Sequence, residues 1–206
     1  MANTPSTRVT TPRARASYAN VFEPRRSPNG DLKYSIMLLF PKDSTDFSEM
    51  KAAVVAAAQK KFPSLGIKTF KDLKESGLKS PFRDGDKEPK YKGKEDYKGM
   101  VFINASDKEA PGIIDENKHP ITSASEFWSG CWCSVSVTFF GYSNSGNEGV
   151  GVGLNNIMRL GKDSRLDNRM AAEDEFEAAP EFAKGNNEDF DSDDDFEEEE
   201  EDDIPF

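Results

Sequence analysis

Cysteine and histidine are almost absent from this chain of 206 residues, which contains two cysteines and one histidine. A fold held together by several disulfides needs more cysteines and is excluded. A closed zinc site needs four ligands, so one built from Cys and His alone is also excluded. No run approaches the roughly 20 apolar residues that cross a membrane. The first residues lack the apolar stretch of a secretory signal, so we expect a reducing, cytoplasmic location.

Charge is distributed unevenly along the chain. The formal net charge is −11, yet residues 171–206 contain 18 acidic residues and a single base, Lys184. This tail contributes −17, which leaves the rest of the chain at +6. A block of like charge repels itself and buries too little apolar area to offset chain entropy. We therefore predict a disordered acidic tail behind a basic domain.

The tail ends in an apolar tip. After an acidic run come Asp202, Asp203, Ile204, Pro205 and Phe206. A solubilising tail needs no such tip, whereas a docking peptide would place its ring in a pocket and its carboxylate against a base. The tip resembles the end of bacterial single-stranded-DNA-binding proteins, an acidic run followed by Asp-Ile-Pro-Phe. That resemblance implies a tail that recruits replication and repair proteins and competes with DNA for the basic body.

Hydrophobic periodicity predicts a mainly β domain. Apolar residues alternate along 130–142, the clearest strand, and along 32–40, where the preceding Asn29-Gly30 predicts a hairpin turn. An alanine-rich stretch that ends at Pro63 predicts a helix over 47–62. The pattern fits an OB-fold-like barrel of five to six strands with one inserted helix and long loops, and a β-sandwich is the alternative. The other expected elements are strands over 13–22 (ended by Pro24), 100–106, 112–115 and 148–160, and a short helix over 70–76.

Three regions follow from these patterns. Residues 1–12, rich in Thr, Pro and Ser, are expected to form a flexible arm. Residues 13–170 are expected to form the barrel domain. Residues 171–206 are the acidic tail with its apolar tip.

The segment 78–99 is long, irregular and rich in lysine, and it interleaves tyrosines with cations. Single-stranded nucleic acid is bound in this way, because cations contact phosphates and aromatic rings stack on bases. A lysine-rich loop with two core tyrosines is an equally good interpretation. The candidate DNA-binding residues in this segment are Lys90, Tyr91, Lys92, Lys94, Tyr97 and Lys98.

A second group of candidates lies on strand faces. Trp132 and Phe140 share a face with small polar residues, which indicates an open stacking platform unless a loop or helix covers it. Tyr18 and Phe102 pose the same question on their own strands. The cations expected to contact phosphate alongside them are Arg13, Arg15, Arg25, Arg26, Lys33 and Arg159.

No pattern of residues supports catalysis. A catalytic triad would have to use His119, which precedes a proline in an expected turn. Cys131 and Cys133 point inward from one strand and are expected to be buried thiols. We therefore predict no enzyme activity, no metal site and no cofactor.

The body resembles a family of bacteriophage single-stranded-DNA-binding proteins long catalogued as a domain of unknown function. The shared motifs are YSIMLLFPK at 34–42, KGMVFINA at 98–105 and GVGLNNI at 151–157, followed by AEDEF at 172–176. The resemblance spans most of residues 10–176. It implies an OB-fold that binds single-stranded DNA in phage replication and recombination, within the host cytoplasm.

Two other classes of function stay open. The chain could be an interaction module or DNA mimic acting through its acidic tail, although the basic body argues against this. It could also be an RNA-binding OB domain, although the tip argues for DNA. The expected partners are single-stranded DNA and, through the tip, replication or recombination proteins, with no membrane. Whether the chain forms homo-oligomers is left open.

Overall fold

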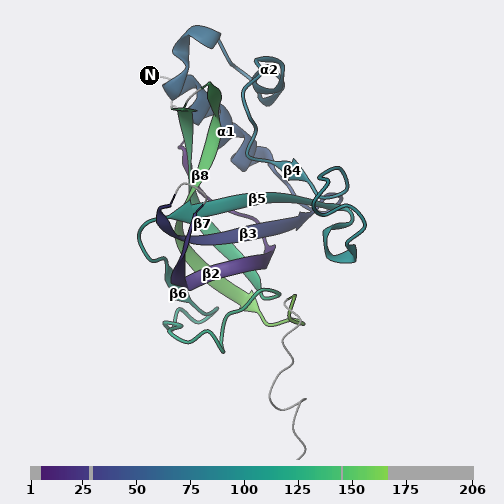
Figure 1. Cartoon of the computed structure of the whole chain (residues 1–206), viewed down its shortest axis with the longest axis vertical. Coiled ribbons are helices and arrows are strands. Elements are labelled where there is room, and N and C mark those ends of the chain that lie inside the picture. Colours follow the sequence, from purple (N-terminus) through teal and green to yellow (C-terminus); the bar gives the residue numbers. More distant parts are fainter. Residues whose placement is uncertain (1–5, 28–29, 145, 167–206) are drawn as a thin grey trace, which may run out of the picture. The chain divides into compact units, whose positions relative to one another are not determined.

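Five strands close on themselves as a barrel in the computed structural model, which describes residues 6–27, 30–144 and 146–166 (Figure 1). Hydrogen-bonded neighbours follow the order β7-β2-β3-β5-β8, and a pairing between β7 and β8 completes the ring. This closed ring confirms the predicted OB-fold-like barrel over the β-sandwich. The barrel strands are β2 (Ala14–Arg26), β3 (Leu32–Pro41), β5 (Met100–Asp107), β7 (Trp132–Asn144) and β8 (Asn147–Gly161).

The ring is antiparallel except at one seam. β5 and β8 run parallel and share a single register pair, Ser106 with Gly153. The longest pairing joins β7 to β8, from Trp132 opposite Gly161 to Asn144 opposite Asn147. The strands predicted over 130–142 and 148–160 are therefore confirmed.

Three short strands extend the sheet. β4 (Arg83–Asp84) pairs with β5, and β6 (Gly112–Ile114) pairs with β8. β1 (Arg8–Thr10) pairs with β7, so the prediction of a loose arm over 1–12 is wrong for its described part. Thr11 is buried there, and its Oγ1 accepts a hydrogen bond from the Val135 amide at 3.0 Å.

β2 also runs further than predicted. The sequence predicts that Pro24 ends this strand after Phe22, but the strand continues to Arg26. The register between β2 and β3 shifts between Asn20 and Arg25. Because proline lacks an N–H, a strand accepts it where regular pairing is already interrupted.

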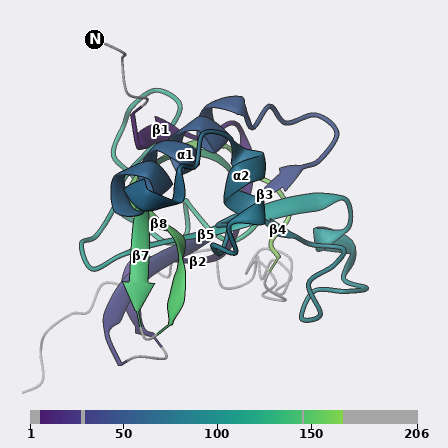
Figure 2. The ribbon, with the colours of Figure 1, turned by 90° about the horizontal axis from the view of Figure 1, so that it is seen from above.

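Two helices lie between β3 and β4. α1 (Ser48–Lys61) confirms the predicted helix over 47–62, and α2 (Phe70–Glu75) confirms the predicted short helix over 70–76. Two 3-10 turns are also present, η1 (Pro63–Leu65) after α1 and η2 (Glu95–Tyr97) before β5. α1 buries Met50 and Val54 and packs mainly against β7. Seen from above, α1 and α2 lie together over the barrel (Figure 2).

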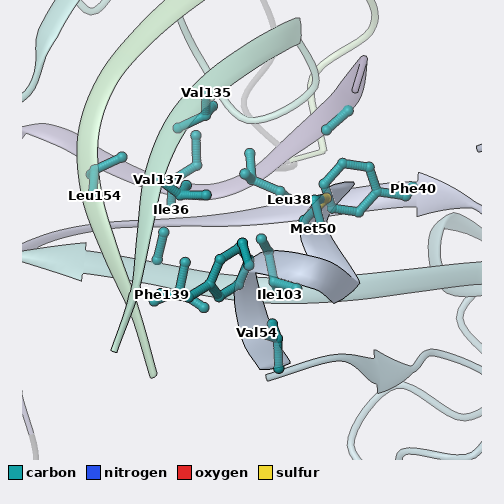
Figure 3. Close-up of a cluster of buried hydrophobic side chains, with 14 of the residues drawn as sticks. Ile36, Leu38, Phe40, Met50, Val54, Ile103, Val135, Val137, Phe139 and Leu154 are labelled. Atoms are coloured by element: carbon teal, nitrogen blue, oxygen red, sulfur yellow. The ribbon is translucent and has the colours of Figure 1, made fainter. Parts of the chain in front are cut away.

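The main core fills the barrel. Alternate residues of β3 point inward, so Ile36, Leu38 and Phe40 are buried there. Figure 3 shows them together with inward side chains from β5, β7 and β8 and with two side chains of α1. Those other labelled residues are Met50, Val54, Ile103, Val135, Val137, Phe139 and Leu154.

Candidate nucleic-acid interface

A second apolar cluster lies on the outer face of the barrel. Met37 and Leu39 alternate with the inward residues of β3 and therefore point the opposite way. They pack with Phe102 of β5 and with Tyr91 and Tyr97 from the loop 85–99. We call these five residues the outer cluster. OB-folds bind oligonucleotides on this part of the barrel, the outer face of their second and third strands.

One row of side chains crosses this face from strand to strand. Arg15 of β2 is in register with Trp132 on one side and with Leu39 on the other. Leu39 is opposite Phe102, which is opposite Arg83 of β4. Residues in register share a face. The row therefore places aromatic and apolar side chains between cations.

The loop 85–99 covers the centre of this row. Tyr91 and Tyr97 stack with ring centroids 4.3 Å apart and an angle of 12° between their planes. Phe102 meets both rings edge-on, at 5.3 and 6.4 Å. The Tyr97 hydroxyl lies 3.0 Å from Ser17 Oγ. Burial raises the pKa of Tyr97 to about 12, so the phenol stays neutral.

Ion pairs stabilise the base of the loop 85–99, where its two ends meet. Lys42 Nζ contacts Asp84 Oδ1 at 2.5 Å and Asp86 Oδ2 at 2.6 Å. The Gly99 amide donates to Asp86 Oδ1 at 3.0 Å, which joins the two ends of the loop. Hydrogen bonds from Lys42 lower the pKa of both carboxyl groups, and these carboxylates raise the pKa of Lys42. The loop is therefore held in place at its base and through Tyr97.

Tyr18 stands at the rim of the outer cluster. It has a φ of 46°, in the left-handed region that non-glycine residues rarely adopt, at an irregularity in the pairing of β2. Its side chain is 47% exposed, and its ring centroid lies 6.4 Å from that of Tyr91. Lys90 Nζ lies 5.4 Å from each of these two rings, and Lys94 Nζ lies 5.9 Å from Tyr91. Two rings and two cations thus meet at the edge of the loop.

Cations also surround the other end of the row. The Arg13 guanidinium lies 4.2 Å from the centroid of Trp132. Arg15 donates to Ser164 Oγ at 2.9 Å and pairs with Asp96 at 3.8 Å. The structure therefore brings nine of the predicted site residues to one face: Arg13, Arg15, Tyr18, Lys90, Tyr91, Lys94, Tyr97, Phe102 and Trp132.

Three of the predicted stacking residues are covered. Phe102 has no exposed surface, so the prediction that it stacks on a base is wrong for this arrangement. Tyr91 and Tyr97 are each 6% exposed, which agrees with the alternative interpretation of core tyrosines. A two-residue period tells which face a side chain takes. It does not tell whether a loop covers that face.

The remaining predicted residues lie outside the outer cluster. Arg25 is opposite Lys33 at the end of the β2–β3 hairpin, next to the exposed Arg26. Phe140, 49% exposed, lies on β7 about 27 Å along the strand from Trp132, at 3.4 Å per residue. Lys92 and Lys98 are exposed on the loop 85–99.

Arg159 has a structural environment. Its side chain is 11% exposed, pairs with Glu116 at 3.6 Å and donates to the Glu126 carbonyl at 2.9 Å. The guanidinium therefore has partners within the fold, and its role as a phosphate contact stays a prediction.

The thiols and the turn histidine behave as predicted. Cys131 and Cys133 are buried and unpaired with each other, and burial raises the pKa of both. His119 is exposed, with Nδ1 3.3 Å from Asp115 Oδ2. Within residues 6–27, 30–144 and 146–166, no cluster of acidic, Cys and His side chains could hold a metal ion, and no helix there is long and apolar enough to span a membrane. The predicted tail and tip, Asp202–Phe206, lie outside the described residues.

Sequence reasoning missed one aromatic residue close to this face. Trp128 precedes β7 and lies under two cations, Lys162 and Arg165. The sequence signal for it is the pair of cations, Lys162 and Arg165, that follows the last strand and precedes the acidic tail. Alternation could not reveal it, because neither Trp128 nor the two cations belong to a strand.

Comparison with known families identifies the chain. Residues 7–204 match the family described as Enterobacter phage Enc34, ssDNA-binding protein. The chain belongs to this family. The resemblance to phage single-stranded-DNA-binding proteins is thus confirmed. The family is described by its DNA binding, which agrees with the prediction of a binding protein.

Individual relatives agree with this assignment. Protein p50 of Acyrthosiphon pisum secondary endosymbiont phage 1 is 33% identical over 147 residues, which cover 69% of this chain and 77% of p50. The single-stranded DNA-binding protein of bacteriophage Enc34, solved in complex with ssDNA, has a TM-score of 0.62 and 22% identity, covering 78% of this chain and 89% of its own. The bacteriophage T7 protein gp2.5, also a single-stranded DNA binding protein, has a TM-score of 0.56 and 13% identity, covering 81% and 91%. These two structures show that the fold is shared.

Proposed function

We propose that this protein binds single-stranded DNA without sequence preference, across the outer face of β2, β3 and β5. Membership of the Enc34 family supports this function, as does the relative solved with ssDNA. The observation that carries it is the position of Lys90 Nζ, 5.4 Å from both the Tyr18 and the Tyr91 ring. Aromatic rings beside cations are the groups that hold single strands.

A nucleobase can take the place of the Lys90 ammonium group at the Tyr18 ring. The Tyr18 side chain is 47% exposed, whereas Tyr91 is covered, so one base can stack on the open face of Tyr18. Lys90, displaced from the rings, then meets the adjoining phosphate. Such stacking contributes roughly 1–3 kcal/mol per base and tolerates any sequence, because every base has an aromatic face.

Phosphate contacts extend the interface on both sides of this base site. Arg13 and Arg15 flank Trp132 at one end of the row, and the β2–β3 hairpin presents its cations at its tip. Binding releases counterions, so affinity falls steeply with salt. The residues we assign to phosphate are Arg13, Arg15, Arg25, Arg26, Lys33, Lys90, Lys92, Lys94 and Lys98, with Phe140 a further stacking residue on the β7–β8 hairpin.

We also assign a role to the tail, residues 171–206. Its charge of −17 competes with DNA for the basic face, and its tip, Asp202–Phe206, recruits replication or recombination proteins. The protein thereby protects single strands during phage DNA replication and recombination in the host cytoplasm. Its role is binding, with no reaction of its own.

The test is a fluorescence-anisotropy titration of labelled oligothymidylate at two salt concentrations. The proteins are the full chain, a form ending at residue 170, Tyr18→Ala, and the control Leu65→Ala, which removes a 46% exposed apolar residue in η1. We expect salt-sensitive binding that tightens on truncation, weakens in Tyr18→Ala and is unchanged in Leu65→Ala.

Each arm has an outcome that overturns its part of the proposal. If neither the full chain nor the truncated form binds, the DNA-binding function is wrong. If truncation leaves the affinity unchanged or weaker, the tail does not compete with DNA. If an RNA oligonucleotide displaces the DNA at equal concentration, the protein is an RNA-binding OB domain as much as a DNA-binding one.

A further inference from the structure

The two tryptophans of the chain share one hydrogen-bond partner. Trp132 Nε1 donates to Asp163 Oδ2 at 2.9 Å, and Trp128 Nε1 donates to the Asp163 carbonyl oxygen at 3.0 Å. Each indole also lies beside cations. Arg13 is 4.2 Å from the centroid of Trp132, whereas Arg165 and Lys162 are 4.7 and 5.4 Å from that of Trp128. The surroundings of Trp128 therefore repeat those of Trp132.

The segment 162–166 joins Trp128 to the proposed DNA-binding face. Ser164 accepts hydrogen bonds from Arg15, which lies in the outer-face row. Two residues on, the Leu166 amide donates to the Ser129 carbonyl at 2.8 Å, and its side chain packs against the outer cluster. The same short segment thus contacts Trp128, Trp132, Arg15 and the outer cluster.

Cations gather around the two indoles. Arg13 and Arg15 lie at Trp132, and Lys162 and Arg165 lie at Trp128. An indole that served only as an anchor would be held by its packing against the main core and by its N–H bond, both of which Trp128 has. Two additional cations on one ring are the arrangement that a stacked base and its phosphates can replace.

We propose that Trp128, with Lys162 and Arg165, forms a second base-stacking subsite for single-stranded DNA, beyond Trp132. This inference rests on the proposed DNA-binding function. A base takes the place of the Arg165 guanidinium on the indole, and Arg165 and Lys162 turn to its phosphates. Asp163 holds the N–H edges of both indoles and thereby fixes where their faces point. The subsite lengthens the bound stretch of DNA.

The presence of only two tryptophans makes the subsite directly observable. In the full-length Trp132→Phe variant, Trp128 is the sole tryptophan, so the fluorescence comes from Trp128. In the Trp128→Phe variant, the fluorescence comes from Trp132. Each protein is titrated with oligothymidylate, with anisotropy of a labelled oligonucleotide followed in parallel. We expect the emission of Trp128 to be quenched as the oligonucleotide binds. Binding without any change in Trp128 emission overturns the subsite and leaves the proposed function intact, whereas no binding by the unaltered protein overturns the function itself.

Affinity as a function of oligonucleotide length separates stacking from a structural role. Oligonucleotides of about 4 and about 16 nucleotides span the usual range of site sizes for one OB-fold. We expect Trp128→Ala to weaken binding of the long oligonucleotide by roughly five- to 150-fold, to leave the short one unaffected, and to be rescued by Trp128→Phe. Equal losses at both lengths, or no loss at either, contradict the subsite. Thermal melting of each variant identifies any unfolded protein before the comparison is made.

Discussion

The hydroxyl groups of Ser17 and Tyr97 lie 3.0 Å apart, and both residues are buried on the outer face of the barrel. Ser17 belongs to β2, whereas Tyr97 belongs to the loop 85–99. This bond therefore ties the loop to β2, whereas Lys42 holds Asp84 and Asp86 at the base of the loop. The loop has two attachments, and each can be tested separately.

Removing the Tyr97 hydroxyl should destabilise the fold. In Tyr97→Phe the buried Ser17 hydroxyl loses its partner, at a cost of about 1 kcal/mol of unfolding free energy. Adding Ser17→Ala removes the stranded hydroxyl, so the double variant should be more stable than the sum of the two single losses predicts. Urea unfolding of the four proteins measures this coupling. Strictly additive losses would show that the two hydroxyls do not interact.

The same tyrosine predicts a loss of stability at alkaline pH. The pKa of Tyr97 is about 12 in the folded chain, above its ordinary value of 10, because burial disfavours the phenolate. The folded state therefore holds this proton longer than the unfolded state, and the stabilisation is lost as the pH rises from 10 to 12. Urea midpoints at pH 9 and pH 11 should fall further in the unaltered protein than in Tyr97→Phe. Parallel falls would place the tyrosine pKa at its ordinary value in both states.

The barrel could be predicted from the sequence because its inner face alternates cleanly. Ile36, Leu38 and Phe40 on β3 face the same side as the inward residues of β7. The same strand also carries a second signal. Met37 and Leu39 make its second half apolar on both faces, which indicates that both faces are covered. Attention to these two residues would have predicted a covering loop.

Other features depend on contacts that no local pattern encodes. β1 forms because β7 offers it an edge, although Arg8–Thr10 has no strand signal of its own. Phe102 is buried because the tyrosine loop, whose path the sequence does not specify, folds over it. Trp128 is linked to the face through the segment that follows β8. Long-range packing decided each of these outcomes.

Replacing Tyr18 should raise the stability of the fold and weaken DNA binding. Its φ of 46° is strained for a tyrosine and acceptable for asparagine, which tolerates the left-handed region. Tyr18→Asn should therefore raise the unfolding free energy by up to about 1 kcal/mol while weakening oligothymidylate binding roughly five- to 150-fold. Lys118→Asn is the control, because Lys118 has a φ of 67° and lies outside the interface. It should stabilise the fold with at most a small change in affinity. Equal losses of affinity in both variants would contradict a role for the Tyr18 ring.

Gly85 tests whether the loop is packed as closely as its contacts indicate. A Cβ at this position would collide with the Tyr97 carbonyl oxygen and come within 3.1 Å of the Met100 carbonyl oxygen. Both are backbone atoms, so the loop itself must move, and overpacking of this kind typically costs about 1–3 kcal/mol. Gly85→Ala should therefore lower the urea midpoint and loosen Tyr97.

The matched control for this collision is Gly93→Ala in the same loop. A Cβ at Gly93 meets nothing within 4 Å, but its φ of 82° favours glycine, so the cost should stay near 1 kcal/mol. Because Gly85→Ala displaces the backbone that carries Tyr97, it alone should also abolish the coupling between Ser17 and Tyr97 in the double-variant comparison. Gly85→Ala could instead be as stable as the unaltered protein and keep that coupling. In that case Tyr97 does not pack the loop against β5, and the outer face is more open than its contacts indicate.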